Sequence, residues 1–306
     1  ISPGWQTSLD FVLVGFPYPQ PLKTPLFFCF LLIYLLTLSG NTLILLAVVS
    51  EPQLQKPMYW FLCHLSVLDM AFSSVVVPKM IVGFVEGGKT ISFGGCVSQL
   101  FFFHFLGSTE CILYTVMAFD RFLAICRPLH YNSIMSLRAS IGFSLGTSIG
   151  GCLNSLIQTS LTFHLPYGRG NKLDYIFCDI PVVLKLACAD TSLNEMLTTV
   201  VVGFVTTTCF LLILTSYIYI ISAILKIRTA EGQRRAFSTC TAHIALVLTY
   251  YVPILFNYLS SGSQDPLGGV VTMFYTTMTP LLNPVIYTLR NKEVKAALMK
   301  LSGKRV

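Results

Sequence analysis

The stretch MAFDRFLAICRPL, residues 117–129, closes a long apolar run that begins near Cys96. An Asp-Arg pair is costly inside a lipid bilayer and ordinary at its edge, so Asp120 and Arg121 are expected where a membrane-spanning helix reaches water. Pro128 then ends the helix or turns the chain. On its own the pattern also fits the solvated end of any helix, so the rest of the chain has to decide.

The composition is that of a protein with several membrane spans. The 306 residues are 54% hydrophobic and only 11% charged, and the mean hydropathy is +0.72, whereas roughly a quarter of the residues of a soluble domain are charged. We therefore predict an all-α membrane protein, a single domain over residues 1–306 built as a seven-transmembrane helix bundle. Seven apolar runs reach the roughly 20 residues that span a bilayer, at 25–49, 58–83, 97–119, 140–163, 197–225, 237–260 and 269–289.

The distribution of basic residues predicts the orientation. If the end with Asp120 and Arg121 lies in the cytoplasm, 14 of the 20 Lys and Arg residues fall on the cytoplasmic side, as the positive-inside rule expects. The N-terminus is then extracellular and the C-terminus cytoplasmic. The net charge of +7 indicates a cytoplasmic face for anionic lipid and an acidic partner. Nucleic acid is not expected, because the aromatic residues lie within the spans and not between basic residues.

Both ends of the chain carry further expectations. No cleavable signal peptide is visible, so the first span is expected to act as the membrane signal. After Arg290, apolar residues recur at helical spacing with lysines between them. This pattern predicts a short amphipathic helix, about 291–301, that lies on the inner leaflet.

Two carboxylates, Asp69 and Glu110, are predicted to lie at membrane depth. Ionisable groups there indicate function, and two of them without a buried Lys or Arg favour a bound cation such as sodium, or a proton shared between them. The alternative is a structural hydrogen-bonded network of the two carboxylates with Asn41 and Asn283. Asn41 in particular needs a partner on another helix.

Four motifs carry a resemblance to a known family. They are PMYWFL at 57–62 with Leu65, Ser66 and Asp69, MAFDRFLAICRPLHY at 117–131, AFSTC at 236–240 with His243, and PLLNPVIYTLRNKEV at 280–294. With the seven spans they resemble a rhodopsin-like G-protein-coupled receptor, and in detail an olfactory receptor. The Leu-Ser before Asp69 and the Phe-Cys-Asp at 177–179 are similar to the tetrapod-type class II.

The sequence departs from the family pattern at several positions. Phe119 and Phe122 stand where the family usually has Tyr, and Trp60 where it usually has Phe. The missing hydroxyls are expected to change how the contact between Asp120 and Arg121, here called the Asp120–Arg121 lock, is held in the resting state. Gly168 stands where a further Cys is usual, so Cys188 is expected to be a free thiol.

The resemblance implies roles for residues at both ends of the bundle. On the outer side, which is oxidising, it pairs Cys96 with Cys178. On the inner side, Arg121 leaves Asp120 when the sixth helix moves, and a stimulatory, olfactory-type G protein binds and raises cyclic AMP. The implied switch residues are Asp120, Arg121, Tyr217, His243 and Tyr287, and the basic rim facing the G protein is Lys226, Arg228, Arg234 and Arg235.

A ligand pocket is expected between the outer halves of the third, fifth, sixth and seventh spans. The lining is mostly apolar with a few hydroxyls and one imidazole, which fits a small hydrophobic molecule with one polar group. For each apolar residue, packing within the bundle is an equal alternative. The candidates are Phe103, His104, Gly107, Ser108, Cys111, Val201, Val202, Val205, Tyr251, Ile254, Leu255, Tyr258, Met273 and Thr276.

His104 has three interpretations: a hydrogen bond to a ligand, a metal ligand together with a nearby Cys, or a satisfied polar residue between helices. A retinal Schiff base is set aside, because residues 270–289 contain no Lys. Recognition of a protonated amine through the third span is also not expected, because its outer half has no Asp.

The function expected from these patterns is that of an odorant receptor of the plasma membrane, with a small volatile ligand, a G protein and membrane lipid as partners. No enzymatic activity, catalytic residue or cofactor is expected. Two alternatives stay open: a metabolite-sensing receptor of the same fold outside the olfactory system, and a transporter or channel. The latter would need repeated halves or a polar path, and no repeat is visible.

Overall fold

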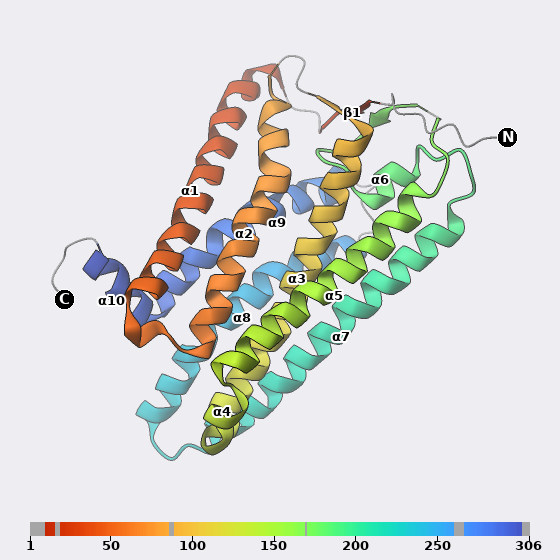
Figure 1. The fold of residues 1–306 in the computed structure, drawn as a ribbon. Helices are drawn as coiled ribbons and strands as arrows, with labels where there is room; N and C mark the ends of the chain where they lie inside the picture. Colours follow the sequence, from red (N-terminus) through yellow and green to blue (C-terminus); the bar gives the residue numbers. More distant parts are fainter. Residues whose placement is uncertain (1–9, 16–18, 86–88, 169, 260–265, 302–306) are drawn as a thin grey trace.

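The computed structural model describes residues 10–15, 19–85, 89–168, 170–259 and 266–301. Its long helices lie alongside one another in a single bundle, with α3 packed against α2, α5, α7 and α8 (Figure 1). The predicted seven-helix bundle is therefore confirmed. The helices are α1 (Lys23–Ser50), α2 (Pro57–Val82), α3 (Phe93–Cys126), α5 (Leu137–Phe163), α7 (Ser192–Leu225), α8 (Ala230–Leu259) and α9 (Pro266–Arg290).

The outer surface of the bundle is apolar. Side chains such as Val49 and Phe204 are 75% and 70% exposed. A large exposed apolar surface is unfavourable in water and favourable in contact with lipid. Within the described part of the chain, five helical stretches are long and apolar enough to cross a membrane, namely Gln20–Ser50, Pro57–Val82, Phe93–Cys126, Ser192–Leu225 and Ala230–Phe256. α5 is richer in Gly and Ser and α9 in Thr and Pro, and both pack tightly within the bundle.

Helices α1 and α9 are joined by two neighbouring residues of α1. Pro284 has no N–H, so the carbonyl of Pro280 one turn earlier lacks its helical partner. Asn41 Nδ2 donates to that carbonyl at 3.0 Å. Gly40 lets the helices approach, because a Cβ there would lie 3.1 Å from Cγ of Pro284. The expected partner of Asn41 on another helix is thus a backbone group freed by a proline.

The outer end of the bundle is closed by a small sheet and a short helix. Strand β1 (Phe11–Leu13) pairs antiparallel with β2 (Thr90–Ile91) and parallel with β3 (Lys172–Leu173). Phe11 and Leu13 are buried beneath the sheet. The long outer loop also contains α6 (Ile180–Leu184). The all-α prediction lacked this sheet, because strands of two or three residues leave no periodic signal in a sequence.

The inner end carries the short helices. α3 ends at Cys126, and Pro128 is the first residue of α4 (Pro128–Ile134), so the predicted break at this proline is confirmed. α10 (Lys292–Leu301) follows α9 and buries Val294 and Ala297. Two 3₁₀ turns, Gln20–Leu22 and Pro52–Leu54, precede α1 and α2.

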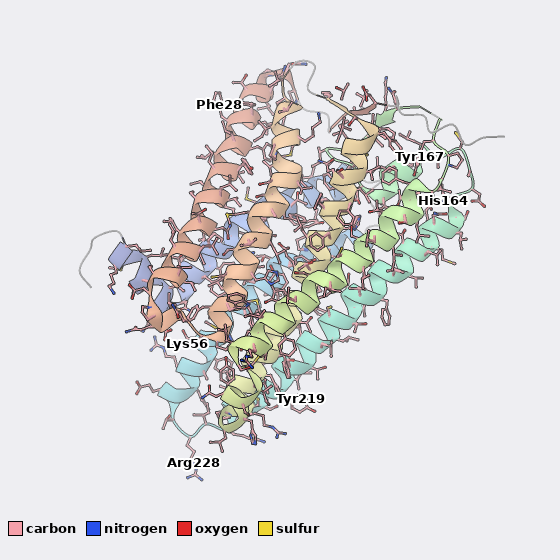
Figure 2. The ribbon with its side chains drawn as sticks, in the orientation of Figure 1. Phe28, Lys56, His164, Tyr167, Tyr219 and Arg228 are labelled. Atoms are coloured by element: carbon pink, nitrogen blue, oxygen red, sulfur yellow. A yellow bond between two sulfur atoms is a disulfide. The ribbon has the colours of Figure 1, made fainter. Side chains whose placement is uncertain are left out.

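Charged side chains tie α10 to the chain between α1 and α2. Lys56 pairs with Glu293 at 3.1 Å, and Lys300 pairs with Glu51 at 2.8 Å. Figure 2 shows Lys56 and Arg228 at this end of the bundle and His164 and Tyr167 at the other. Two of the basic residues on which the predicted orientation rests thus lie at the same end as α10.

Candidate functional site

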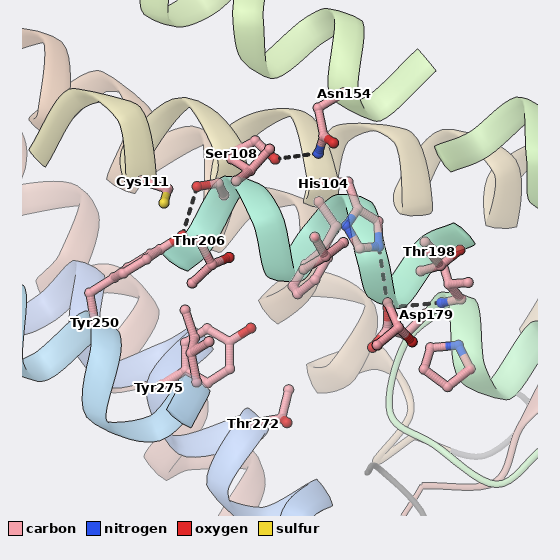
Figure 3. A pocket seen from close by; sticks show the side chains of 18 of the residues that line it. His104, Ser108, Cys111, Asn154, Asp179, Thr198, Thr206, Tyr250, Thr272 and Tyr275 are labelled. Atoms are coloured by element: carbon pink, nitrogen blue, oxygen red, sulfur yellow. Dashed lines mark hydrogen bonds and ion pairs between the residues drawn. The ribbon is translucent and has the colours of Figure 1, made fainter. Parts of the chain in front are cut away.

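A cavity of about 440 Å³ opens between the outer halves of the helices, below the loop that carries α6 (Figure 3). α3 supplies one wall, α7 a second, and α8 and α9 the side facing them. Eight of the predicted residues line it: Phe103, His104, Gly107, Ser108, Cys111, Val202, Val205 and Ile254.

Five of the other predicted residues do not line the cavity. Leu255 is 42% exposed on the outside of α8, and Tyr251 lies behind the wall, where its hydroxyl contacts Sγ of Cys111 at 3.2 Å. Val201 also lies outside the lining. On α9, Met273 and Thr276 are replaced by their neighbours Thr272 and Tyr275, because one residue turns a helix by about 100°. The side chain of Tyr258 lies outside the described residues.

Sequence reasoning missed the polar residues that reach the cavity from other elements. Asp179 is the most informative, because it directly follows Cys178, and the disulfide carries that part of the loop over the bundle. That adjacency was a usable signal. For the remaining lining residues, the sequence does not show which way the side chain points from its helix or loop. They are Phe72, Asn154, Tyr175, Ile180, Pro181, Thr198, Thr199, Thr206, Tyr250, Thr272 and Tyr275.

The outer end of the cavity is polar. His104 Nε2 lies 3.3 Å from Asp179 Oδ1, with side chains 15% and 17% exposed, but the ring N–H is not aligned for a hydrogen bond, and Nε2 has no hydrogen-bond partner among the described residues. Tyr175 lies close by. Burial raises the pKa of its hydroxyl, and the Asp179 carboxylate raises it further, so Tyr175 stays a neutral phenol.

Two hydrogen bonds fix the wall deeper in the cavity. Asn154 of α5 donates to Ser108 Oγ at 2.7 Å, and Tyr250 of α8 donates to the carbonyl of Gly107 at 2.8 Å (Figure 3). The second bond uses a backbone acceptor on α3. It therefore ties the cavity wall directly to α8.

The intramembrane carboxylates form a cluster. Asn283 Nδ2 lies 2.9 and 2.8 Å from the two carboxylate oxygens of Asp69, and Glu110 is buried close to Asp69. Neighbouring buried carboxyl groups do not ionise together, so at least one of them is expected to keep its proton. Asn41 lies apart, bonded to α9 as described. The described residues hold no group of three or more His, Cys, Asp or Glu side chains that could bind a metal.

A second polar cluster lies toward the inner end, where His243 uses both ring nitrogens. Nε2 lies 3.1 Å from the carbonyl of Tyr114, which can only accept, so Nε2 carries the hydrogen. Nδ1 then accepts from the hydroxyl of Tyr217 at 2.7 Å. Tyr287 is fully buried nearby. The arrangement links α3, α7 and α8 through one imidazole.

The expected Asp120–Arg121 lock is not formed. No ion pair joins the two among the residues that the structure describes; instead Asp120 accepts from the hydroxyl of Tyr131 at 2.8 Å, and Arg121 contacts the sulfur of Met58. Successive helix residues point about 100° apart, which gives each side chain a different neighbour. Burial raises the pKa of Tyr131, and the Asp120 carboxylate adds to the shift.

The two phenylalanines of the motif face away from Asp120. Phe119 packs toward Phe143 of α5 and Phe122 toward Tyr219 of α7. The contact of Asp120 described above does not involve either ring, and the expected effect of the missing hydroxyls stays a prediction. On the inner rim, Lys226, Arg228 and Arg234 are exposed, and the side chain of Arg235 lies outside the described residues.

Cys96 and Cys178 are joined by a disulfide bond, the pair that the resemblance implies, with their Cα atoms 5.5 Å apart. Cys188 is an exposed free thiol. A Cβ built on Gly168 would lie 3.2 Å from Sγ of Cys188. The position expected to hold a partner cysteine is thus next to Cys188, and its glycine leaves the thiol unpaired.

Known proteins resemble this chain over almost its full length. The sequence model of the olfactory receptor family matches residues 28–304. Olfactory receptor 10G6 of Homo sapiens is 59% identical over 304 residues, which cover 99% of this chain and 92% of the relative. Olfactory receptor 10G7 of Homo sapiens is 55% identical, with 96% and 94% covered, and olfactory receptor 10D1B of Mus musculus is 52% identical, with 94% and 93% covered.

Proposed function

The chain belongs to the olfactory receptor family, and from this premise we propose that it binds a small, mostly hydrophobic volatile molecule and activates a stimulatory, olfactory-type G protein, raising cyclic AMP. Its fold is that of a seven-helix receptor, not an enzyme. The proposal includes the plasma membrane as its site, with the N-terminus outside and the basic inner rim in the cytoplasm.

The observation that carries the proposal is the cavity of about 440 Å³ and its wall on α8. This volume lies in the range of small-molecule sites. Val202, Val205 and Ile254 supply apolar surface, while the outer end supplies polar groups. A small molecule with an apolar body and one polar group matches this lining.

Helix α8 connects the cavity to the inner cluster. Tyr250 contacts α3 at the cavity wall, and His243, about two turns away along the same helix, holds Tyr217 of α7 and the backbone of α3. A ligand that binds better when α8 has shifted would favour that arrangement, since only a difference in affinity moves a conformational equilibrium. In the shifted arrangement Arg121, Tyr217 and Tyr287 become free to contact the G protein.

The cluster of Asp69, Glu110 and Asn283 is assigned a supporting role. It holds either a sodium ion or a shared proton between α2, α3 and α9. The burial of the two carboxyl groups close to each other favours the proton, and added sodium would have to displace it. Sodium-dependent ligand affinity in the wild type that disappears in Asp69→Asn would identify the ion.

The test is a panel of volatile compounds on cells that express the chain, with cyclic AMP as the readout. Active compounds should raise cyclic AMP in the wild type and fail to do so in Arg121→Ala, while surface expression stays the same. His104→Ala should change the order of potency of the compounds. Unchanged signalling in Arg121→Ala would sink the proposed mechanism, and an unchanged order in His104→Ala would remove His104 from the site.

A further inference from the structure

A carboxylate without a fixed cation lies at the outer end of the cavity. Asp179 lines it, with its side chain 17% exposed. None of the described residues that line the cavity is Lys or Arg. A partly buried carboxylate is costly unless hydrogen-bond donors or a cation meet it, and here His104 is the only lining side chain that could become cationic.

The carboxylate is held rigidly. Its neighbour Cys178 is fixed by the disulfide to Cys96, and the backbone N–H of Cys178 donates to Gln99 Oε1 at 2.9 Å. Asp179 itself caps α6, where Oδ1 accepts from the N–H of Ile180 at 2.8 Å. A group positioned in this way loses little entropy when a ligand binds it.

One oxygen of Asp179 is left for a ligand. Both contacts, from Ile180 and from His104, go to Oδ1, and Oδ2 makes no hydrogen bond to any described residue. A carboxylate oxygen only accepts. The complementary ligand group is therefore a hydrogen-bond donor.

Two further polar atoms of the lining lack a partner. The hydroxyl of Thr198 lies at this end and Oδ1 of Asn154 deeper in the cavity; both atoms are buried, and neither has a hydrogen-bond partner among the described residues. Figure 3 shows Thr198 close to Asp179, with Cys111 and Tyr250 at the opposite end of the cavity. The two ends differ in chemistry, so a ligand with unlike ends would have one preferred direction.

We propose that the ligand is a small amphipathic molecule whose hydroxyl or amine head donates a hydrogen bond to Oδ2 of Asp179, with its apolar body against Val202, Val205 and Ile254. The inference rests on the proposed function, because it specifies the ligand of the same cavity. Recognition of a protonated amine through the third span is not expected from the sequence, because the outer half of that span lacks an Asp. In this proposal Asp179 of the outer loop supplies the carboxylate instead. An acceptor-only head, such as an ether, would leave Oδ2 desolvated and unpaired.

The experiment compares three compounds with one carbon skeleton: a primary amine, the matching alcohol and its methyl ether. Each is tested on the wild type, Asp179→Asn and Asp174→Asn. Asn keeps the size and an oxygen to cap α6, but can place an N–H₂ where Oδ2 stands. Asp174 is an exposed residue of the same loop outside the cavity, so its substitution removes the same charge nearby. Binding is measured as the ligand-induced shift in melting temperature of the purified protein, and signalling as cyclic AMP.

The amine and the alcohol should bind the wild type about tenfold to a hundredfold more tightly than the ether. Asp179→Asn should remove this advantage, most strongly for the amine, and leave the ether unchanged or improved. Asp174→Asn should behave as the wild type.

Three results would overturn the inference: equal binding of the ether, no binding of either donor compound, or an equal loss of binding in Asp174→Asn. The last would mean that the effect is one of general charge. The predicted binding order without any rise in cyclic AMP would support the inference and overturn the proposed signalling instead.

Discussion

Two histidines of the same bundle are used in opposite ways. His243, near the inner end, is 1% exposed and has a partner on each ring nitrogen. His104, near the outer end, lines the cavity, and its Nε2 lies beside a carboxylate without an aligned hydrogen bond. The inner imidazole is satisfied by the fold, whereas the outer one keeps bonding capacity for a ligand.

The difference shows how the two ends are built. The outer end is held by a covalent bond and a small sheet, so that its polar groups need not stabilise it. The inner end is held by hydrogen bonds between side chains, which can exchange partners when a helix moves. A buried polar group without a hydrogen-bond partner costs stability. Such a group is therefore expected where a ligand will supply the missing hydrogen bond.

The largest effect is expected from the covalent anchor of the outer end. Cys96→Ser removes a disulfide across 82 residues, which should lower the free energy of unfolding by about 4 kcal/mol and abolish ligand binding. Thermal unfolding of purified protein measures the first and ligand-induced stabilisation the second. Cys188→Ser, which removes a free thiol, is the control. Retained ligand binding in Cys96→Ser would mean that the bond does not position Asp179.

The two histidines themselves provide the next test. His243→Ala leaves the Tyr217 hydroxyl buried without its acceptor and removes the second hydrogen bond to the Tyr114 carbonyl, which keeps its bond within α3. The free energy of unfolding should therefore fall by about 2 kcal/mol, with a change in basal cyclic AMP. His104→Ala should cost below about 1 kcal/mol, since it removes no aligned hydrogen bond. Equal losses of stability would contradict the contrast between them.

A second covalent bond should stiffen the outer end further. In Gly168→Cys, the new side chain lies beside Cys188 and should form a disulfide, raising the free energy of unfolding by about 1–2 kcal/mol, less than loop entropy alone gives. Mass spectrometry after thiol labelling reports the bond. The double variant Gly168→Cys, Cys188→Ser cannot form it and should gain nothing.

A smaller effect is expected from the hydrogen bond that replaces the Asp120–Arg121 lock. Tyr131→Phe removes the donor to Asp120, so stability should fall by about 1 kcal/mol and basal cyclic AMP should rise. Phe119→Tyr adds a hydroxyl on the face toward α5 and should change neither. If basal cyclic AMP rises in Phe119→Tyr but not in Tyr131→Phe, the residue at position 119 and not Tyr131 controls the resting state.

The smallest effect concerns the attachment of α10. Partial burial raises the pKa of Glu293, but hydrogen bonds from Tyr59 and Lys56 outweigh it, and the pKa lies below its usual value of 4.5. A lowered pKa adds stability that is present at neutral pH and lost as the pH falls below 4.5. Because the side chain is half exposed, Glu293→Gln should cost less than about 1 kcal/mol at pH 7. Thermal unfolding from pH 7 to about pH 3 measures this, with Glu231→Gln as the control.

The bundle could be predicted from the sequence because apolar runs of membrane length leave few alternatives. The break at Pro128 and the helix after Arg290 follow from equally local rules. The sheet of β1, β2 and β3 could not, since its pairing depends on where three distant segments meet. The extension of α7 back to Ser192 was also missed, because its first turns are polar.

The cavity was predictable where helical phase was fixed by a motif. On α3, spacings of three and four residues along one face gave five residues that line the cavity, whereas on α9 the phase was wrong by one position. Contacts between different helices were harder to predict. Asp120 bonds Tyr131 and not Arg121 because of the turn between α3 and α4, and the periodicity of the sequence does not describe that turn. Asp179 illustrates the limit, because its place in the cavity results from a bond made by its neighbour.

The order of the small sheet has a consequence for biogenesis. β1 lies in its centre, between β2 and β3, yet it is the first of the three to be synthesised. Its second neighbour, at Lys172, is made only after α5, so Phe11 and Leu13 stay uncovered until more than half of the 306 residues have been synthesised. Long-range pairing of this kind is slow and leaves apolar segments open to chaperones and to aggregation. Closure of the N-terminal strand therefore depends on a segment that is made only in the second half of synthesis.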